Sequence, residues 1–239
     1  MTNLVSMLWI EMRKAVRSGM PLWTVFGSLL MPLGIAFLIF VARNPEISRQ
    51  LGLVSAKADL LAYAATDWST YLSFYGMHIA AGGLVLFGMV ISWIFGREFA
   101  DGTLKDLLAV PVPRFSILLA KFVVCMVWST MLAAVILSIG LVMGAIIRLP
   151  DASVPVIIKG SSMVMTTTGL VIAVTTPFAF LASAGRGYLL PVGGAILALM
   201  MANILALAGW GEYFPWGIPG LYAMGESPLR PISYGIVFL

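Results

Sequence analysis

The sequence contains very little charge. Only 10% of its 239 residues are Asp, Glu, Lys or Arg, whereas 61% are apolar and the mean hydropathy is +1.02. A soluble globular chain carries about a quarter charged residues. The shortage therefore excludes an ordinary soluble domain. The small net charge of +4 fits the usual excess of Lys and Arg on the cytoplasmic side of a membrane protein, and we expect no nucleic-acid partner.

Metal-ligating side chains are equally scarce, because Cys125 is the single cysteine and His78 the single histidine. No disulfide can form within the chain, and no metal site is expected because such a site needs several ligands. His78 lies in an apolar segment, where an ionisable residue is a functional candidate by default. A proton-relay role and a neutral, hydrogen-bonded histidine both remain open, and its isolation favours the second.

The chain also lacks the Gly-rich phosphate-binding loop that ends in Gly-Lys-Ser or Gly-Lys-Thr. We therefore expect no catalytic residue and no cofactor on this chain. Its apolar stretches contain no paired carboxylates, which argues against two alternatives. An ion-coupled secondary transporter normally needs ionisable relays within the membrane. A non-transporting membrane enzyme or scaffold, such as an intramembrane protease, would need a catalytic constellation at that depth.

Five stretches without Asp, Glu, Lys or Arg dominate the sequence. Each has 25 to 29 residues, and about 20 are enough for a helix to cross the hydrocarbon. Because lipid requires every backbone group to be satisfied internally, these stretches predict an all-α membrane protein. The stretches are 18–42, 68–96, 122–147, 160–185 and 187–211.

The first residues predict a helix that lies in the membrane interface. Apolar side chains recur at helical spacing over 4–17, and Arg13, Lys14 and Arg17 supply charge on other faces. These three basic residues place the N-terminus in the cytoplasm. With that start, eight Lys and Arg residues fall inside and six outside, which is a weak bias of the expected sign.

The C-terminal part differs from the rest in its turn-forming and aromatic residues. Residues 210–230 are rich in Gly, Pro and aromatics, which predicts broken or re-entrant helices at the outer interface. Residues 231–239 begin another apolar helix that is too short to cross. We expect this sixth helix to continue past Leu239.

The link between the second and third stretches is too long and too patterned to be a simple tether. Thr103 and Asp106 have capping-box spacing, and Asp101 and Lys105 stand four residues apart as a favourable pair. Pro111 and Pro113 stop the helix. The apolar stripe of this helix consists of Leu104, Leu107 and Leu108. The pattern predicts a short amphipathic helix on the cytoplasmic surface, which suits a segment that receives force from a cytosolic partner.

This link resembles the signature of ABC-2 type transporter permeases. The matching residues are Glu98, Gly102, Thr103 and Leu104, followed by Leu107, Leu108 and Pro111-Val-Pro-Arg114. The resemblance implies a six-transmembrane-helix, type V exporter-like bundle, similar to the small permeases of bacterial antimicrobial-peptide and bacitracin export or immunity systems. The whole chain would then be one permease domain. Its segments would be an interfacial helix (1–19), spans at 20–42, 70–96, 116–147, 156–185 and 187–209, a cytoplasmic coupling helix (97–114), an outer re-entrant segment (210–230) and the start of a sixth span (231–239).

The resemblance also implies a mechanism. Two permease subunits, identical or different, would pair in the plasma membrane of a bacterium, and two copies of a separate ABC ATPase would bind ATP and Mg²⁺. The cargo would be hydrophobic or amphipathic: a peptide antibiotic, a drug or a lipid-linked molecule. Glu98 would bond into the ATPase groove and Gly102 would allow close approach. The coupling residues implied are Arg97, Glu98, Asp101, Gly102, Thr103, Leu104, Lys105, Leu107, Leu108 and Arg114.

Three further features of the spans leave alternatives open. Gly140 and Gly144 form a Gly-x-x-x-Gly pair, which marks either the contact between permeases or an internal helix contact. Pro32 and Pro177 should kink their helices, either as hinges for alternating access or as static kinks, and the static kink is favoured. Five threonines between 166 and 176 either line a polar path or bond to their own helix backbone.

Overall fold

A computed structural model describes residues 2–43, 67–225 and 231–238. The described residues form helices and no strand. The elements are α1 (Thr2–Arg17), α2 (Met20–Arg43), α5 (Trp68–His78), the π-helix η1 (Ile79–Gly83), α6 (Leu84–Ala100), α7 (Leu104–Ala109), α8 (Arg114–Ile146), α9 (Val154–Thr175), α10 (Pro177–Ala184), α11 (Leu189–Leu207), the 3₁₀-helix η2 (Gly211–Tyr213), α12 (Ile218–Met224) and α13 (Pro231–Phe238).

Five of these helical stretches are long and apolar enough to cross a membrane, as the sequence predicts. They are Met20–Val41, Trp68–Ala100, Arg114–Ile146, Val154–Ala184 and Leu189–Leu207. The second stretch combines α5, η1 and α6. Residues 226–230 of the expected re-entrant segment lie outside the described residues.

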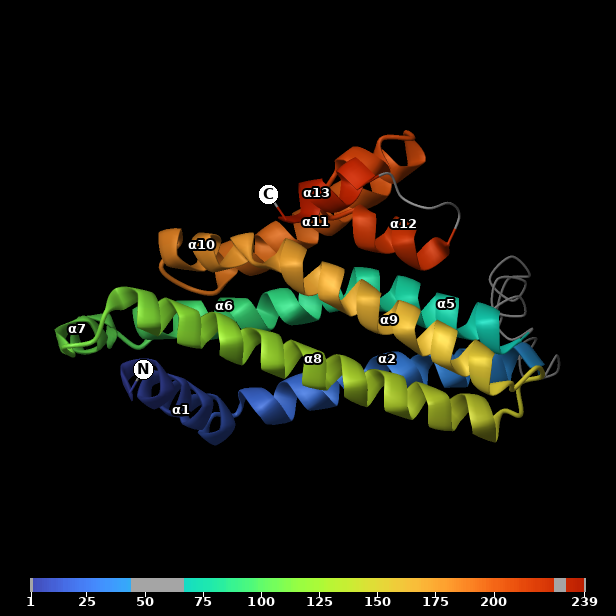
Figure 1. The fold of residues 1–239 in the computed structure, drawn as a ribbon, viewed down its shortest axis with the longest axis horizontal. Coiled ribbons are helices and arrows are strands. Elements are labelled where there is room, and N and C mark those ends of the chain that lie inside the picture. The colour runs from blue at the N-terminus through green and yellow to red at the C-terminus, as the bar shows by residue number, and fades with distance from the viewer. Residues whose placement is uncertain (1, 44–66, 226–230, 239) are drawn as a thin grey trace.

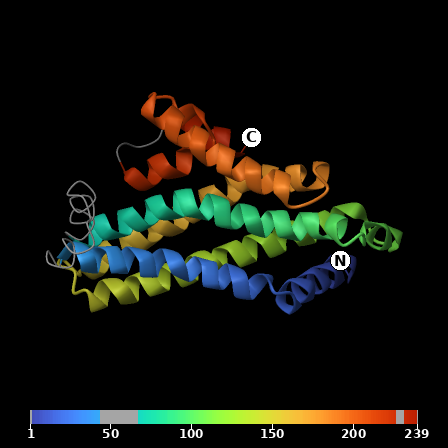
Figure 2. The ribbon, with the colours of Figure 1, turned by 180° about the vertical axis from the view of Figure 1, so that it is seen from behind.

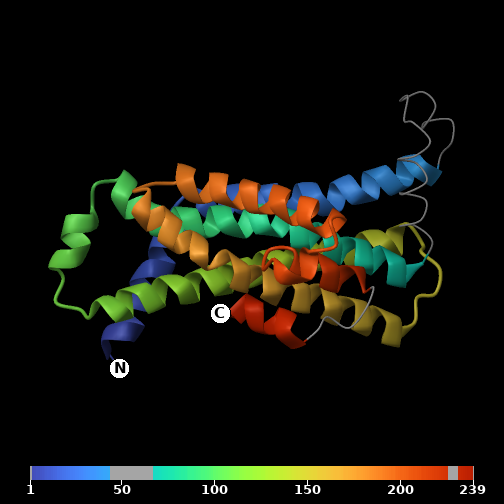
Figure 3. The ribbon, with the colours of Figure 1, turned by 90° about the horizontal axis from the view of Figure 1, so that it is seen from above.

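The long helices run side by side along the longest axis of the molecule (Figures 1 and 2). The short helix α7 lies at one extreme of the bundle, and α1 with the N-terminus lies near the same end (Figures 1 and 3). The helix α12 lies toward the opposite half, beside α5. The connection between α6 and α8, which contains α7, therefore forms one end of the bundle. We call it the α7 end.

Local chemistry explains where two of the helices break. The Ser18 hydroxyl donates to the carbonyl of Ala15 at 2.6 Å and accepts the amide N–H of Met20 at 3.3 Å, which separates α1 from α2. The expected kink at Pro177 is confirmed as a break between α9 and α10, because proline has no N–H for the helix ladder. At Pro32 the helix α2 continues without interruption.

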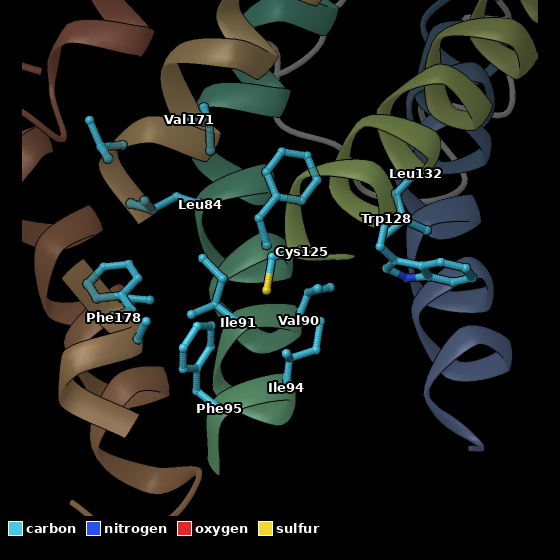
Figure 4. Packing of buried hydrophobic residues seen from close by; sticks show 14 of the residues in the cluster. Leu84, Val90, Ile91, Ile94, Phe95, Cys125, Trp128, Leu132, Val171 and Phe178 are labelled. Atoms are coloured by element: carbon cyan, nitrogen blue, oxygen red, sulfur yellow. The ribbon is translucent and has the colours of Figure 1, made fainter. Parts of the chain in front are cut away.

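The main hydrophobic core surrounds α6. Its side chains pack against α8 on one side and against α9 and α10 on the other (Figure 4). Phe87 and Val90 of α6 are fully buried, as is Leu132 of α8. The indole N–H of Trp128 on α8 also donates to the hydroxyl of Thr24 on α2 at 3.1 Å. This core holds the second, third and fourth spans as one unit.

The Gly140 and Gly144 pair makes an internal contact in this chain. A Cβ atom at Gly140 would lie 2.6 Å from the Tyr75 ring, and one at Gly144 would lie 2.6 Å from the Trp68 ring. The Tyr71 hydroxyl donates to the carbonyl of Gly140 at 2.9 Å. Of the two open interpretations, the geometry supports internal helix packing, because aromatic side chains of α5 already occupy the glycine face of α8.

The hydroxyls of the fourth span also have an internal explanation. Thr167, Thr168, Thr175 and Thr176 each donate to a carbonyl of their own helix three or four residues earlier, at 2.6 to 2.9 Å. These hydroxyls are therefore satisfied within the helix, as threonines commonly are in membrane spans. They do not support a polar path along the fourth span.

Candidate functional site at the α7 end of the bundle

The link between α6 and α8 contains a helix, as expected, but this helix is shorter than the coupling helix predicted over 97–114, because residues 97–100 still belong to α6. The helix α7 begins directly after Thr103, and the chain becomes extended at Val110 just before Pro111. The two prolines therefore follow the end of the helix, as predicted. The helix has six residues.

Two details of the predicted helix start are wrong. The Thr103 side chain forms no cap hydrogen bond, and Asp101 lies 4.0 Å from Arg97 rather than forming an ion pair with Lys105 among the described residues. Both differences follow from the turn at residues 101–103. Gly102 has a φ of +69°, which favours glycine, so that Asp101 and Lys105 do not share one helix. No described atom lies within 4 Å of a Cβ built at Gly102, so its close approach to a partner stays a prediction.

The link has a half-buried side and an exposed side. Leu107 packs against a buried cluster that consists of Met7 of α1 with Ile117 and Ala120 of α8. A cavity of about 190 Å³ lies between the link, α6 and α8, and Leu104 and Leu107 line it. The side chain of Leu108 is not described. The exposed residues of the link are the polar or small residues Asp101, Gly102, Thr103, Lys105, Asp106 and Arg114, together with Ala109, Val110, Pro111 and Pro113.

Glu98 lies inside the protein and not on the exposed side. It is 3% exposed, and Lys121 Nζ lies 2.7 Å from its Oε1 atom. Lys14 Nζ lies 3.5 Å from the same oxygen. In this conformation the Glu98 carboxylate is occupied by lysines of its own chain, and its expected bond to an ATPase stays a prediction.

Glu98 belongs to a cluster of four charges that we call the charge cluster: Glu11, Lys14, Glu98 and Lys121. Glu11 of α1 lies 2.7 Å from Lys14 and 3.5 Å from Lys121. Lys121 also donates to the carbonyl of Ile94 on α6 at 2.8 Å. The two carboxylates and the two ammonium groups balance, and the cluster connects α1, α6 and α8 at the base of the link.

Burial makes this cluster sensitive to the loss of its buried members, Glu11, Glu98 and Lys121. Glu11 and Lys121 are 5% and 4% exposed, whereas the Lys14 side chain is 29% exposed. An unpaired charge at such a position costs several kcal/mol, and paired charges with additional hydrogen bonds largely avoid this cost. Lys121 therefore links α8 to Glu11 of α1 and to Glu98 of α6 at the centre of the cluster.

The end of α6 also contacts the turn between α10 and α11. The Ser92 hydroxyl donates to the carbonyl of Tyr188 at 3.1 Å, and a Cβ at Gly96 would lie 3.0 Å from the backbone of Gly187. The Arg97 guanidinium lies over the ring of Trp93, 4.9 Å from its centroid. The base of the link thus reaches the fourth and fifth spans as well.

Sequence reasoning missed three of the four cluster residues. The spacing over residues 4–17 predicts only an interfacial helix for Glu11 and Lys14. Lys121 contributes only to the count of Lys and Arg residues expected on the cytoplasmic side. The available signal was that Lys121 and Glu11 each stand among apolar residues at helical spacing. Their buried ends meet only because α1 folds back beside α8, which periodicity does not reveal.

The described residues contain no group of three or more His, Cys, Asp or Glu side chains that could hold a metal ion. The arrangement at the α7 end instead presents an exposed, charged link above a neutral charge cluster. Such a site suits mechanical contact with another protein. The chain thus has the features of a multi-pass helical membrane protein with a structured link on one side.

Comparison with known proteins assigns the family. The profile of the ABC-2 family transporter proteins matches residues 7–203, and the chain belongs to this family of transporter membrane subunits. It is 28% identical over 156 residues to the bacitracin transport permease protein BCRB of Bacillus licheniformis, an alignment that covers 65% of this chain and 75% of that protein. No solved structure matches the chain. The family assignment agrees with the resemblance of residues 98–114 to the permease signature.

Proposed function

We propose that this chain is the permease subunit of an ATP-driven exporter, and that the charge cluster passes the movement of an ATPase into the membrane spans. The observation that carries the proposal is the connection of the link to three helices through Glu98 and Lys121. An exposed link could be moved without effect if it were attached only at its ends. Here its base shares charges with α1 and α8.

The exposed side of the link is the proposed docking surface for the ATPase. Asp101, Lys105 and Asp106 offer charges of both signs to a partner, whereas Leu107 packs inward on the cluster of Met7, Ile117 and Ala120. A push on α7 would therefore reach α1 and α8 through apolar contacts. The cavity of about 190 Å³ beneath the link gives α7 room to move.

The partners follow from the membership in an ABC transporter family. We propose two permease subunits and two ATPase copies, with ATP and Mg²⁺ bound by the ATPase. The α7 end and the N-terminus would face the cytoplasm of a bacterium, and α1 would lie in the membrane interface. Val5, Trp9 and Val16 of α1 are 67%, 60% and 60% exposed, which suits contact with lipid headgroups and acyl chains.

The proposed cargo is hydrophobic or amphipathic. The family relative named for bacitracin transport supports a peptide antibiotic or a similar molecule, in an export or immunity role. The spans contain no group of acidic and histidine ligands among their described residues, so that an apolar cargo suits them better than a metal ion.

The docking surface can be tested by charge reversal on the exposed side of the link. We expect Lys105→Glu and Asp106→Lys each to weaken co-purification of the ATPase and permease-stimulated ATP hydrolysis by about fivefold, since each contact is worth on the order of 1 kcal/mol. Leu107→Arg should abolish both. The matched control is Lys159→Glu, which changes an exposed lysine on α9. Normal assembly and hydrolysis in all three link variants would refute the proposal.

The charge cluster can be tested separately with a neutral double variant. Glu98→Gln combined with Lys121→Met removes one positive and one negative charge, and leaves Glu11 paired with Lys14. We expect normal ATPase assembly but ATP hydrolysis that no longer drives transport of a peptide antibiotic into inverted vesicles. Full transport by this variant would show that the cluster serves stability alone.

A further inference from the structure

A second candidate site lies in the half of the bundle that carries α12. A cavity of about 250 Å³ opens between the end of α5, the π-helix η1, α11 and α12. Apolar side chains form most of its wall, including Met77, Leu199, Trp216 and Leu221. Two polar side chains, His78 and Asn203, interrupt this apolar wall. An apolar cavity with a few polar groups is the usual form of a small-molecule site.

The orientation of His78 leaves one ring nitrogen available to the cavity. Its Nδ1 atom lies 2.8 Å from the carbonyl oxygen of Phe74. A carbonyl only accepts hydrogen bonds, so Nδ1 must carry the hydrogen, and in the neutral ring Nε2 is then an acceptor. Nε2 has no partner among the described residues. The sequence-based expectation of a hydrogen-bonded histidine is thus confirmed. The acceptor atom Nε2 remains available to a ligand in the cavity.

The side-chain amide of Asn203 on α11 is oriented by a hydrogen bond to its own helix, as the His78 ring is. Its Nδ2 atom donates to the carbonyl of Leu199 at 2.8 Å, which fixes the amide orientation because the carbonyl requires a donor. The Oδ1 atom is the other end of the amide and has no hydrogen-bond partner within the described part of the chain. Both polar groups of the cavity therefore offer acceptors.

The wall of the cavity includes an irregular helical turn. Ala80 and Ala81 of η1 line it, directly after His78. A π-helix widens the backbone by one residue per turn, and such segments occur frequently at functional sites. Here the widened turn contributes two small side chains, Ala80 and Ala81, to the wall of the cavity. Gly220 on α12 keeps the facing side small as well.

We propose that this cavity binds an apolar group that carries a hydrogen-bond donor, such as a hydroxyl or an amide N–H, which donates to His78 Nε2 or to Asn203 Oδ1. This inference rests on the proposed function, since it names the chemistry of the cargo or of a membrane ligand. The volume is below the roughly 300–1,000 Å³ of sites that enclose a drug-sized molecule. The cavity thus takes one side chain or one tail of a larger amphipathic molecule.

The test uses photolabelling of the full-length protein, purified with its native partners and placed in lipid nanodiscs without ATP. The probes are a diazirine-bearing octanol and its methyl ether, which lacks the donor. We expect the alcohol to label Met77, Ala81 or Leu199, with saturation by excess unlabelled octanol. Labelling by the ether at these residues should be about five- to tenfold weaker, as one hydrogen bond predicts.

Variants assign the effect to the two acceptors. The double variant His78→Leu with Asn203→Leu should reduce labelling by the alcohol to the level of the ether, and the single change that alone reaches this level identifies the acceptor that binds the hydroxyl. The matched control is Ser138→Ala, whose hydroxyl is exposed and bonds to its own helix at Ala134. Equal labelling by the two probes, or labelling that does not saturate, would overturn the proposal. Because no ATP is present, such a result would leave the coupling role of the link untouched.

Discussion

The two ends of the bundle are held together by different kinds of contact. At the α7 end, the charge cluster joins three helices through ion pairs of 2.7 to 3.5 Å. Far from α7, Trp68, Tyr71 and Tyr75 of α5 fill the space above Gly140 and Gly144 of α8. We call these five residues the aromatic junction. Its rings would come within 2.6 Å of added Cβ atoms.

The two kinds of contact differ in how readily they rearrange when the helices shift. In the charge cluster, Glu98 Oε1 is shared by two lysines, so the pairs can exchange as helices shift. The aromatic junction offers no such exchange, because close-packed rings against glycine lose contact when they separate. Tyr71 also donates to the Gly140 carbonyl, which fixes the register of α5 on α8. We therefore expect the α7 end to move more readily than the aromatic junction.

The largest effect is expected from Lys121→Met. This change leaves Glu98 with only its more distant lysine and removes the second partner of Glu11, at positions that are 3% and 5% exposed. Breaking a buried pair in this way costs about 3–5 kcal/mol. Detergent-induced unfolding, followed by tryptophan fluorescence, should show this loss, and the added change Glu98→Gln should restore part of it. An unchanged unfolding midpoint would mean that the cluster is not desolvated.

Gly144→Leu tests the aromatic junction. The new side chain would displace the Trp68 ring, and overpacking of this kind costs about 1–3 kcal/mol. The same unfolding measurement should show the loss. Gly169→Ala on α9 is the matched control, because no described atom lies within 4 Å of its added Cβ. If both variants unfold alike, the junction is looser than the geometry indicates.

Trp128→Phe removes one hydrogen bond between α8 and α2. The indole N–H donates to Thr24 at 3.1 Å, and its loss should destabilise the protein by about 1 kcal/mol. A double-mutant cycle with Thr24→Val separates the bond from the change in ring size. Strict additivity of the two single changes would contradict a direct interaction.

Lys14→Met should have the smallest effect on stability. Its side chain is 29% exposed, and partly exposed pairs contribute below about 1 kcal/mol. The unfolding midpoint should therefore move much less than in Lys121→Met, although both lysines reach the same Glu98 oxygen. A loss as large as that of Lys121→Met would show that burial does not rank the two lysines.

Much of the fold could be predicted from the sequence. The charge-free stretches predicted the five helical stretches that, among the described residues, are long and apolar enough to cross a membrane. Pro111 and Pro113 predicted where α7 ends. The cap at Thr103 and the pairing of Asp101 were predicted wrongly, because a turn at Gly102 separates them from the helix. Within the candidate site, the exposed link was foreseen, whereas the charge cluster beneath it was not.

Composition and spacing alone determined that this chain is helical, membrane-spanning and equipped with a structured link, because lipid leaves the backbone few choices. Only the tertiary structure decided what Glu98 contacts. Its partner Lys121 is 23 residues away in sequence, and Glu11 is farther still. The periodicity of one helix predicts which of its faces is apolar, but it does not predict which other helix packs against that face.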